Sequence, residues 1–225
     1  MTTHVALLGH PVSHSLSPRM QNAAFAAAGL DWYYAAFDVE DPLAAVAALR
    51  TLGFAGTNVT IPHKRTVVAV CDEADGEAVN TLVFRGRRVL GFNTDKEILA
   101  GINATRACLI GAGGAAQTLA PALPADTRVF TRRGEWPPDA SGCDLIVNAT
   151  PVRDELLVEP HAGQTVVELA YSVDQPETAL VAAARAAGCE VIDGLEALVR
   201  QGAKSFELWT GVDAPVDVMR SSIRP

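Results

Sequence analysis

Apolar runs with strand character alternate with helical patterns along the first part of the chain. Short runs rich in β-branched and aromatic residues predict strands over residues 4–9, 32–39 and 56–60. Apolar positions at helical spacing, with helix-start signals before them, predict helices over residues 18–28, 42–52 and 64–71. This alternation predicts an α/β unit with a mostly parallel sheet.

Two helix starts and one hairpin have local signals. Ser17 stands immediately before Pro18, so we expect Ser17 to be the N-cap of a helix that begins with proline. Asp41 and Pro42 give the second helix the same kind of start. Two apolar runs within residues 81–92, separated by Arg-Gly-Arg-Arg, predict a hairpin.

A second series of strands and helices begins near residue 96. Its predicted strands cover residues 105–110, 127–131, 144–149, 165–170 and 190–192. Its predicted helices cover residues 115–123, 175–187 and a segment from residue 195 towards Gly211. We therefore expect a first domain of residues 1–96, completed by helices of residues 196–225. A compact second domain of residues 97–195 would be inserted into it.

Composition narrows the possible partners and the cellular setting. The net charge of −8 argues against nucleic acid or an anionic membrane as the main partner. No apolar run approaches the roughly 20 residues needed to span a bilayer. The first residues lack a basic region followed by an apolar run, so we expect no signal peptide.

Neither the cysteines nor the histidines predict a metal site. Cys71, Cys108, Cys143 and Cys189 lack zinc spacing and are expected to be reduced core thiols of a cytoplasmic protein. His10 and His14 are four residues apart, but Pro11 argues against a helical metal pair.

Candidate chemistry begins at Asn-Val-Thr-Ile-Pro-His-Lys, residues 58–64. Pro62 ends the predicted strand, because proline has no N–H for a sheet ladder. Thr60 and Lys64 then emerge at the carboxyl end of a strand, the edge where ligands bind in open α/β sheets. A lysine there can exchange a proton with a ligand. The alternative is an ordinary solvated lysine.

Polar residues elsewhere suggest partners for Lys64 and a site for an anion. Asp95, in Asn-Thr-Asp at residues 93–95, can pair with Lys64 and hold a substrate hydroxyl, or it is simply a helix cap. Ser15 and Ser17 lie beside a helix start, where hydroxyls and N–H groups can hold a carboxylate. As an alternative, they form only a capping loop.

A glycine-rich turn in the second domain predicts a dinucleotide site. Gly-Ala-Gly-Gly-Ala-Ala at residues 111–116 fits G-x-G-x-x-A between a strand and a helix. About twenty residues on, Thr131, Arg132 and Arg133 stand where an NAD site would carry an acidic residue. Two guanidinium groups suit a 2′-phosphate, so NADP is favoured, with a solvated basic turn as the alternative.

These motifs together resemble the shikimate dehydrogenase family, which includes quinate dehydrogenases, over nearly the whole chain. The matching segments follow in the family's order. They are residues 15–18 (Ser-Leu-Ser-Pro), 58–64, 78–81 (Ala-Val-Asn-Thr), 93–95, 111–116, 148–151 (Asn-Ala-Thr-Pro), 193–195 (Asp-Gly-Leu), 201–203 (Gln-Gly-Ala) and 205–209 (Ser-Phe-Glu-Leu-Trp).

The resemblance implies roles for individual residues and an active-site cleft between a substrate domain and a Rossmann-like domain. Lys64 and Asp95 would be the catalytic pair. The substrate would be bound by Ser15, Ser17, Thr60, Asn80, Tyr171 and Gln201. NADP would be bound by Gly111, Gly113, Gly114, Ala115, Ala116, Thr131, Arg132, Arg133, Asn148, Ala149, Thr150, Leu169 and Gly194.

The sequence departs from the family at several places. Lys96 stands where the family usually has glycine, and Gln21 replaces a usual histidine. The arginine turn only loosely matches the family's Asn-Arg-Thr, and residues 148–152 lack a glycine that commonly follows. Several segments of the nucleotide domain are also short. The shortening affects the coenzyme site more than the substrate residues.

The expected activity is the reversible NADP-dependent reduction of 3-dehydroshikimate to shikimate by a cytoplasmic monomer or homodimer. Two alternatives remain at this point. One is a family member that acts on quinate or an aminoshikimate. The other is a non-catalytic ligand-binding homologue with a weakened coenzyme site.

Overall fold

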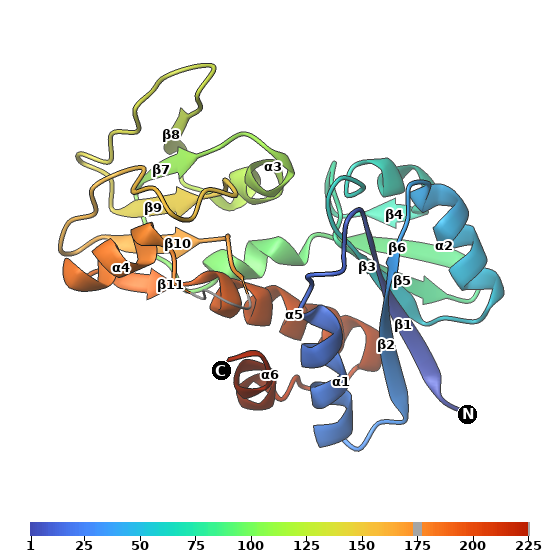
Figure 1. Ribbon diagram of the computed structural model, residues 1–225. Coiled ribbons are helices and arrows are strands. Elements are labelled where there is room, and N and C mark those ends of the chain that lie inside the picture. The colour runs from blue at the N-terminus through green and yellow to red at the C-terminus, as the bar shows by residue number, and fades with distance from the viewer. Residues whose placement is uncertain (173–176, 225) are drawn as a thin grey trace. The chain divides into compact units, whose positions relative to one another are not determined.

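The computed structural model describes residues 1–172 and 177–224, and the chain divides into two compact units (Figure 1). The first unit comprises Met1–Glu97 and Leu198–Pro225, and the second comprises Ile98–Ala197. Each unit is built around its own β-sheet. The second unit is inserted in the sequence of the first, so the chain leaves the first unit once and returns to it.

The first unit contains a mixed six-stranded sheet with the order β2-β1-β3-β5-β6-β4. Its strands are β1 (Thr3–Gly9), β2 (Trp32–Asp38), β3 (Gly56–Val59), β4 (Glu73–Ala74), β5 (Thr81–Arg85) and β6 (Arg88–Phe92). β1 runs parallel to β2 and β3, whereas β5 runs antiparallel to β3 and β6. The predicted hairpin is confirmed, and its turn uses Gly86 at a φ of 58°.

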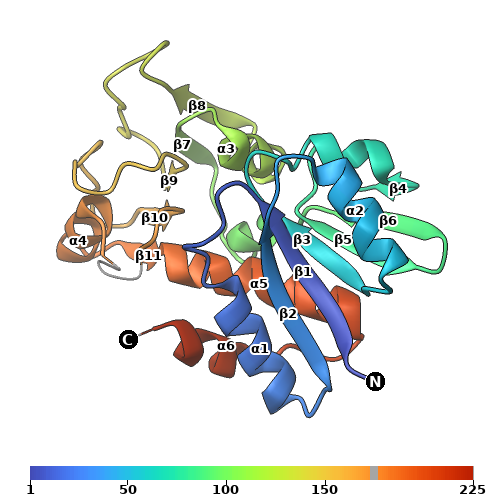
Figure 2. The same cartoon turned by 45° about the vertical axis from the view of Figure 1, so that its right-hand side comes forward.

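Helices cover both faces of this sheet. They are α1 (Ser17–Ala27), α2 (Pro42–Thr51), α5 (Gly194–Thr210) and α6 (Val216–Ile223), with the 3₁₀ helix η1 (Thr66–Val70). The 3₁₀ helix η2 (Thr94–Leu99) follows β6 where the chain passes from the first unit to the second. α1 and α6 lie side by side (Figure 2). Phe25 of α1 stacks on Phe206 of α5 with ring centroids 5.3 Å apart. The Trp209 indole N–H donates to the Leu82 carbonyl at 3.0 Å, which attaches α5 to β5.

Two local predictions in this unit were wrong. Ser17 is the first residue of α1 and not its N-cap; Leu16 takes the cap position without a side-chain bond. The helix expected over residues 64–71 is instead the short 3₁₀ helix η1, Thr66–Val70. The run is rich in β-branched residues, which disfavour an α-helix. The start of α2 is confirmed, with Asp41 accepting from the N–H groups of Leu43 and Ala44.

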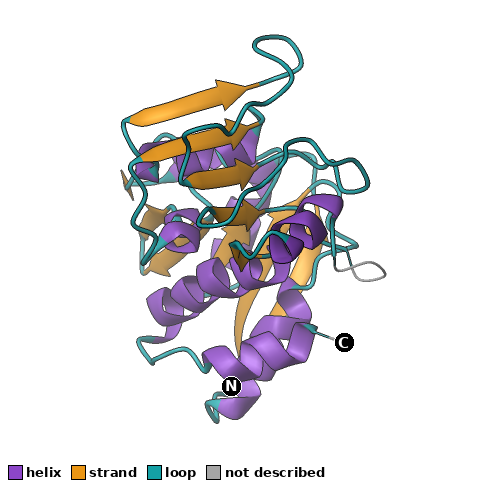
Figure 3. Cartoon of the chain, turned by 90° about the vertical axis from the view of Figure 1, so that its left-hand side faces the viewer, coloured by secondary structure: helices purple, strands orange, loops and turns teal. Residues whose placement is uncertain are grey.

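The second unit contains a five-stranded parallel sheet with the order β11-β10-β9-β7-β8, whose strands can be followed in Figure 3. The strands are β7 (Arg106–Ile110), β8 (Asp126–Phe130), β9 (Leu145–Asn148), β10 (Thr165–Glu168) and β11 (Glu190–Ile192). β7 begins the series, β8 lies on one side of it and β9 on the other. The strand order therefore reverses between β7 and β9, as at the ligand-binding point of doubly wound sheets.

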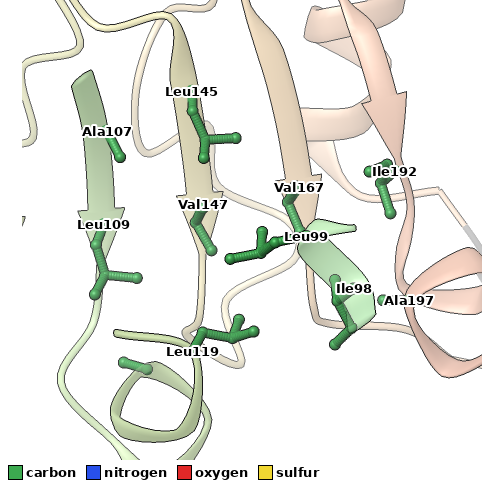
Figure 4. Packing of buried hydrophobic residues seen from close by; sticks show 11 residues of the cluster. Ile98, Leu99, Ala107, Leu109, Leu119, Leu145, Val147, Val167, Ile192 and Ala197 are labelled. Carbon is green, nitrogen blue, oxygen red and sulfur yellow. The ribbon is translucent and has the colours of Figure 1, made fainter. Parts of the chain in front are cut away.

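Both faces of this sheet are packed, and alternate residues of a strand point to opposite faces. Ala107 and Leu109 belong to one core cluster, whereas Cys108 and Ile110 belong to the other. In the first cluster, side chains from η2, α3 and the strands come together, with Leu99, Leu119 and Val147 close to one another (Figure 4). This two-sided burial explains why these strands are continuous apolar runs in the sequence.

Two predicted helices are shorter than expected. The helix after the glycine turn is α3 (Gly114–Leu119), followed by the 3₁₀ helix η3 (Ala120–Ala122), because Pro121 cannot donate a helical hydrogen bond. The helix predicted over residues 175–187 is α4 (Ala179–Ala186), which begins after the cap of Thr178. Residues 175 and 176 of that prediction lie outside the described residues.

The four cysteines are free thiols, as predicted. Burial raises the pKa of Cys71 to about 11 and that of Cys108 to about 12, so both thiols are protonated near neutral pH. Among residues 1–172 and 177–224, no helix combines the length and the apolar character needed to cross a bilayer.

Candidate active site

Lys64 lies in a tight connection that leaves β3 at the carboxyl edge of the first sheet. The Thr60 N–H donates to the Leu8 carbonyl at 2.8 Å, which continues the ladder between β1 and β3. Beyond Pro62, the Lys64 carbonyl accepts from the Val79 N–H at 3.0 Å. The backbone is therefore hydrogen-bonded before Pro62, at Thr60, and after it, at Lys64. These bonds fix the position from which the Lys64 side chain extends.

The ammonium group of Lys64 forms a close ion pair with Oδ2 of Asp95, the second residue of η2. The side chains of Lys64 and Asp95 are only 14% and 11% exposed. Such a pair is poorly screened by water, so each charge depends on the other to remain in this position. The structure thus brings together the two residues for which the sequence suggested proton transfer.

Asn80 holds the second oxygen of the Asp95 carboxylate. Its Nδ2 donates to Asp95 Oδ1 at 2.8 Å. Its Oδ1 accepts from the Thr94 N–H at 2.8 Å, which fixes which end of the amide faces Asp95. The same Nδ2 lies 3.5 Å from Oε1 of Gln201, on α5. Four polar residues from separate segments therefore form one connected group.

A buried polar cluster below Asn80 supports this arrangement, and sequence reasoning assigned it no role. Asn58 Nδ2 donates to the Asn80 carbonyl at 3.0 Å and to Ser205 Oγ at 3.0 Å. Thr81 Oγ1 lies 2.8 Å from the same Ser205 oxygen. Asn58 and Ser205 belong to motifs quoted above, so their presence there was the only available signal.

The remaining substrate candidates of the first unit lie on other loops. Ser15 Oγ accepts from the Ser17 N–H at 3.2 Å at the start of α1. The hydroxyl groups of Ser17 and Thr60 have no hydrogen-bond partner within the described part of the chain. Both can therefore bind a ligand. The methyl group of Thr60 packs against Gly9, where a Cβ atom would lie 2.3 Å away.

Two residues that differ from the family pattern, Lys96 and Gln21, form hydrogen bonds with their side chains. Lys96 Nζ donates to Asp75 Oδ2 at 2.9 Å, in an ion pair that is partly exposed. Gln21 is fully buried on α1, and its Nε2 donates to the Gly202 carbonyl at 2.9 Å, next to Gln201. Neither substitution removes a member of the Lys64 group.

In the second unit, the glycine turn meets the end of β9 at the point where the strand order reverses. Gly111 follows β7 and has a φ of 108°, a conformation that favours glycine. A Cβ atom at this position would lie 3.1 Å from Thr150 Cγ2 and 3.2 Å from the Ala149 carbonyl oxygen. The close approach of these two loops therefore depends on glycine at 111.

The other glycine-turn residues leave space for a ligand. A Cβ atom at Gly113 would meet open space, and Gly114 begins α3, with Ala115 and Ala116 in its first turn. Leu169 follows β10 and donates its N–H to the Asn148 carbonyl at 3.1 Å. Gly194 begins α5, and a Cβ atom there would lie 2.4 Å from the Ala170 carbonyl oxygen. Tyr171, predicted to contact substrate, belongs to this unit and follows Ala170.

The basic turn after β8 has one engaged arginine. Arg132 Nη2 lies 3.1 Å from Glu155 Oε2, and its guanidinium lies 5.6 Å from the Trp136 ring centroid. Both charged side chains are more than half exposed, so the ion pair is weak and can open for a phosphate. Arg133 is exposed and forms no ion pair within residues 1–172 and 177–224.

These features fit a dinucleotide with a 2′-phosphate. The glycine turn gives a pyrophosphate close access to backbone N–H groups, and the two arginines supply positive charge where an NAD site has a carboxylate. Asn148, Ala149, Thr150, Leu169 and Gly194 all lie at the carboxyl edge of the same parallel sheet or directly after it. The residues present are therefore suitable for NADP.

Family models match both ends of the first unit. The shikimate dehydrogenase substrate binding domain matches residues 7–82, and the shikimate 5′-dehydrogenase C-terminal domain matches residues 194–224. Among solved structures, the chain is similar to a shikimate 5-dehydrogenase from Thermus thermophilus in complex with NADP(H) and shikimate. The TM-score is 0.83, with 31% sequence identity over 99% of each chain.

Relatives that match over nearly their whole length are also shikimate dehydrogenases. The shikimate dehydrogenase (NADP⁺) of Moorella thermoacetica is 39% identical over 98% of this chain and 92% of its own. That of Methanopyrus kandleri is 37% identical over 99% and 95%. The first alignment runs over 273 positions, more than the 225 residues of this chain, so the relative carries segments that this chain lacks. Two matching family models and identities above one third over nearly the whole chain place this protein in the shikimate dehydrogenase family.

Proposed function

We propose that the protein catalyses the reversible NADP-dependent reduction of 3-dehydroshikimate to shikimate. The observation that supports this most directly is the shielded Lys64–Asp95 pair, joined through Asn80 to Gln201. A binding protein has no need of a lysine and a carboxylate held in contact for proton exchange. The first unit then binds the substrate, and the second binds NADP.

The substrate is held by hydroxyl and amide groups. Ser15 and Ser17 bind the carboxylate with their hydroxyls, assisted by Tyr171. The ring hydroxyls are bound by Thr60, Asn80 and Gln201. Asn80 and Gln201 lie within hydrogen-bond reach of each other, at 3.5 Å, and this contact lowers the entropy cost of ordering their side chains around the substrate.

Lys64 exchanges the proton of the reacting hydroxyl. During shikimate oxidation the neutral amine of Lys64, formed when its ammonium has released a proton to solvent, accepts this proton as the C–O single bond becomes a carbonyl, and in the reverse direction the ammonium returns it. Asp95 keeps the Lys64 ammonium in place and accepts a hydrogen bond from the same substrate hydroxyl. When bound, the nicotinamide ring of NADP supplies the site that takes up or releases the hydride.

In the coenzyme site, Gly111, Gly113, Gly114, Ala115 and Ala116 hold the pyrophosphate, while Thr131, Arg132 and Arg133 bind the adenosine phosphate. The net charge of −8 makes this local positive charge necessary for an anionic coenzyme. The same net charge and the free thiols fit a cytoplasmic monomer or homodimer that acts on small molecules and not on nucleic acid.

The test compares the native protein with Lys64→Met in the presence of shikimate and NADP⁺, by following NADPH formation. We expect kcat to fall by roughly 10²–10⁴-fold in the variant, with a much smaller change in shikimate binding. Lys96→Met is the matched control, because Lys96 pairs with the partly exposed Asp75, outside the Lys64 group. Native protein that binds shikimate and NADP⁺ without turnover would instead support a ligand-binding homologue.

A further inference from the structure

Glu168 is a fully buried acidic residue at the carboxyl end of β10. In the sheet register it stands opposite Asn148, the last residue of β9. No lysine or arginine forms an ion pair with it within residues 1–172 and 177–224. A buried acid without a cation is costly unless several donors satisfy it, so its partners indicate what it does.

Hydrogen-bond donors surround the carboxyl group. Asn148 Nδ2 lies 3.1 Å from Oε1 and 3.0 Å from Oε2. The Ala170 N–H donates to Oε1 at 2.9 Å, and the Thr178 hydroxyl donates to Oε2 at 3.0 Å. Burial raises the pKa of Glu168, while these hydrogen bonds act in the opposite direction.

Glu168 fixes the orientation of the Asn148 amide together with the Val152 carbonyl, which lies 3.4 Å from Nδ2. Because Nδ2 of Asn148 faces the carboxyl group, its Oδ1 faces the next loop. There it accepts from the Thr150 N–H at 3.0 Å and from the Thr150 hydroxyl at 2.7 Å. Rotating the amide by half a turn would place Oδ1 against Glu168 and Nδ2 against the Thr150 N–H, and the bonds to Glu168 and to the Thr150 N–H would be lost.

The loop held in this way is the one that meets the glycine turn. A Cβ atom at Gly111 would lie 3.1 Å from Thr150 Cγ2 and 3.2 Å from the Ala149 carbonyl oxygen. A shift of this loop therefore changes the space beside the turn that binds the pyrophosphate. The bonds connect Glu168 to Asn148, then to Thr150, and the Thr150 side chain packs at Gly111.

We propose that Glu168 is a positioning residue for the coenzyme, which acts through Asn148 to hold the turn at Ala149 and Thr150 in the shape that binds NADP. This inference rests on the proposed function of the second unit. Glu168 does not touch NADP. It orders the loop before the coenzyme arrives, so less ordering is needed on binding.

The Glu168 carboxyl group also accepts a hydrogen bond from Thr178, which lies at the start of α4 and outside the loop at Ala149 and Thr150. A variant of Thr178 is therefore the control for effects on stability alone. Thr178 caps α4, because its Oγ1 also accepts from the Val181 N–H at 3.2 Å. Thr178→Val removes a bond to Glu168 and this cap but leaves the bond between Glu168 and Asn148 in place. Loss of stability and loss of loop order can therefore be separated.

The experiment measures the Kd of NADP⁺ by titration calorimetry for the native protein, Glu168→Gln and Thr178→Val. In Glu168→Gln the new amide presents Nε2 to Asn148 Nδ2 in either orientation, so Asn148 keeps one of its two contacts and meets a second donor in place of the other. We expect its Kd to rise about tenfold to a hundredfold, the effect of leaving one buried donor unsatisfied. Thr178→Val should lower Tm and change this Kd by no more than about twofold.

A shortened acid tests the same connection in a second way. If Glu168→Gln does not fold, Glu168→Asp, whose carboxyl group is retracted by one methylene, should show the same weakening.

Each outcome has a definite reading. A native-like Kd in folded Glu168→Gln, or equal weakening in Thr178→Val, overturns the proposal, and so does a native-like Kd in Glu168→Asp. In steady-state assays the KM for NADP⁺ should rise while that for shikimate stays constant. Native protein that binds NADP⁺ but does not oxidise shikimate contradicts the proposed function and leaves the Glu168 comparison valid. Native protein that does not bind NADP⁺ overturns both.

Discussion

Replacing Asp95 with asparagine tests whether the charge of this residue matters separately from its shape. The Asp95 carboxylate accepts two donors, Lys64 Nζ on Oδ2 and Asn80 Nδ2 on Oδ1. Asparagine has a single acceptor oxygen. In one orientation its amide nitrogen faces the Lys64 ammonium, and in the other it faces the Asn80 amide. One of the two contacts must therefore be lost.

The size of the effect follows from the shielding of the pair. The charge-assisted bond to Lys64 contributes about 1.5–3 kcal/mol, and the side chains are only 14% and 11% exposed, so water replaces it poorly. Lys64 also loses the partner that orients it towards the substrate hydroxyl. We expect kcat for shikimate oxidation to fall by roughly 10²–10³-fold, or about 3–4 kcal/mol in the activation barrier.

The assay is steady-state NADPH formation with shikimate and NADP⁺, and Asp75→Asn is the matched control. Asp75 pairs with Lys96 in a more exposed ion pair, so its replacement should change kcat by less than about threefold. The KM for NADP⁺ should remain within about threefold in both variants, since neither residue belongs to the second unit. A kcat for Asp95→Asn within about threefold of native would refute this role for the charge.

Three further predictions concern the coenzyme, the substrate and stability. Neutral residues at Arg132 and Arg133 should raise the KM for NADP⁺ about tenfold to a hundredfold and leave that for NAD⁺ nearly unchanged, as steady-state kinetics with both coenzymes would show. Ser17→Thr should lower the ratio of shikimate to quinate kcat/KM, because the pocket around the substrate carboxylate changes shape; an unchanged ratio would remove Ser17 from that pocket. Asp144 accepts from the Thr105 and Arg106 N–H groups, which lowers its pKa to about 2, so its stabilising effect is present above the unfolded pKa of about 3.9 and is lost as pH falls towards 2. Asp144→Asn should therefore lower the urea midpoint near pH 7, and the difference from native should shrink in acid; a difference that is constant with pH would contradict this.

Where sequence and structure agree, a short local signal determines the outcome. Asp41 before Pro42 fixes the start of α2, and Gly86 fixes the turn of the hairpin. The alternation of cores on β7 is visible in the sequence only as an apolar run, because both faces are buried. These features depend on residues close together in the chain.

The features that the sequence did not predict depend on contacts between residues far apart in the chain. β4, Glu73–Ala74, exists because it pairs with β6, and two residues carry no strand pattern of their own. Glu168 has the appearance of an ordinary strand-end acid until Asn148 and Thr178 are seen to donate to it. The motif residues Lys64 and Asp95 were found from sequence, but the orientation of the Asn80 amide that faces Asp95 follows from the Thr94 backbone N–H.

The most direct test of the proposed activity is a comparison of kcat/KM for shikimate and quinate, each with saturating NADP⁺ and NAD⁺. Quinate carries an additional hydroxyl on the carbon that bears its carboxylate, and a pocket without a partner for it leaves this group unpaired at a cost of about 1–3 kcal/mol. We predict that shikimate with NADP⁺ is the best combination, by about tenfold to a hundredfold over quinate. Equal turnover of quinate, or equal use of NAD⁺, would contradict the assignment.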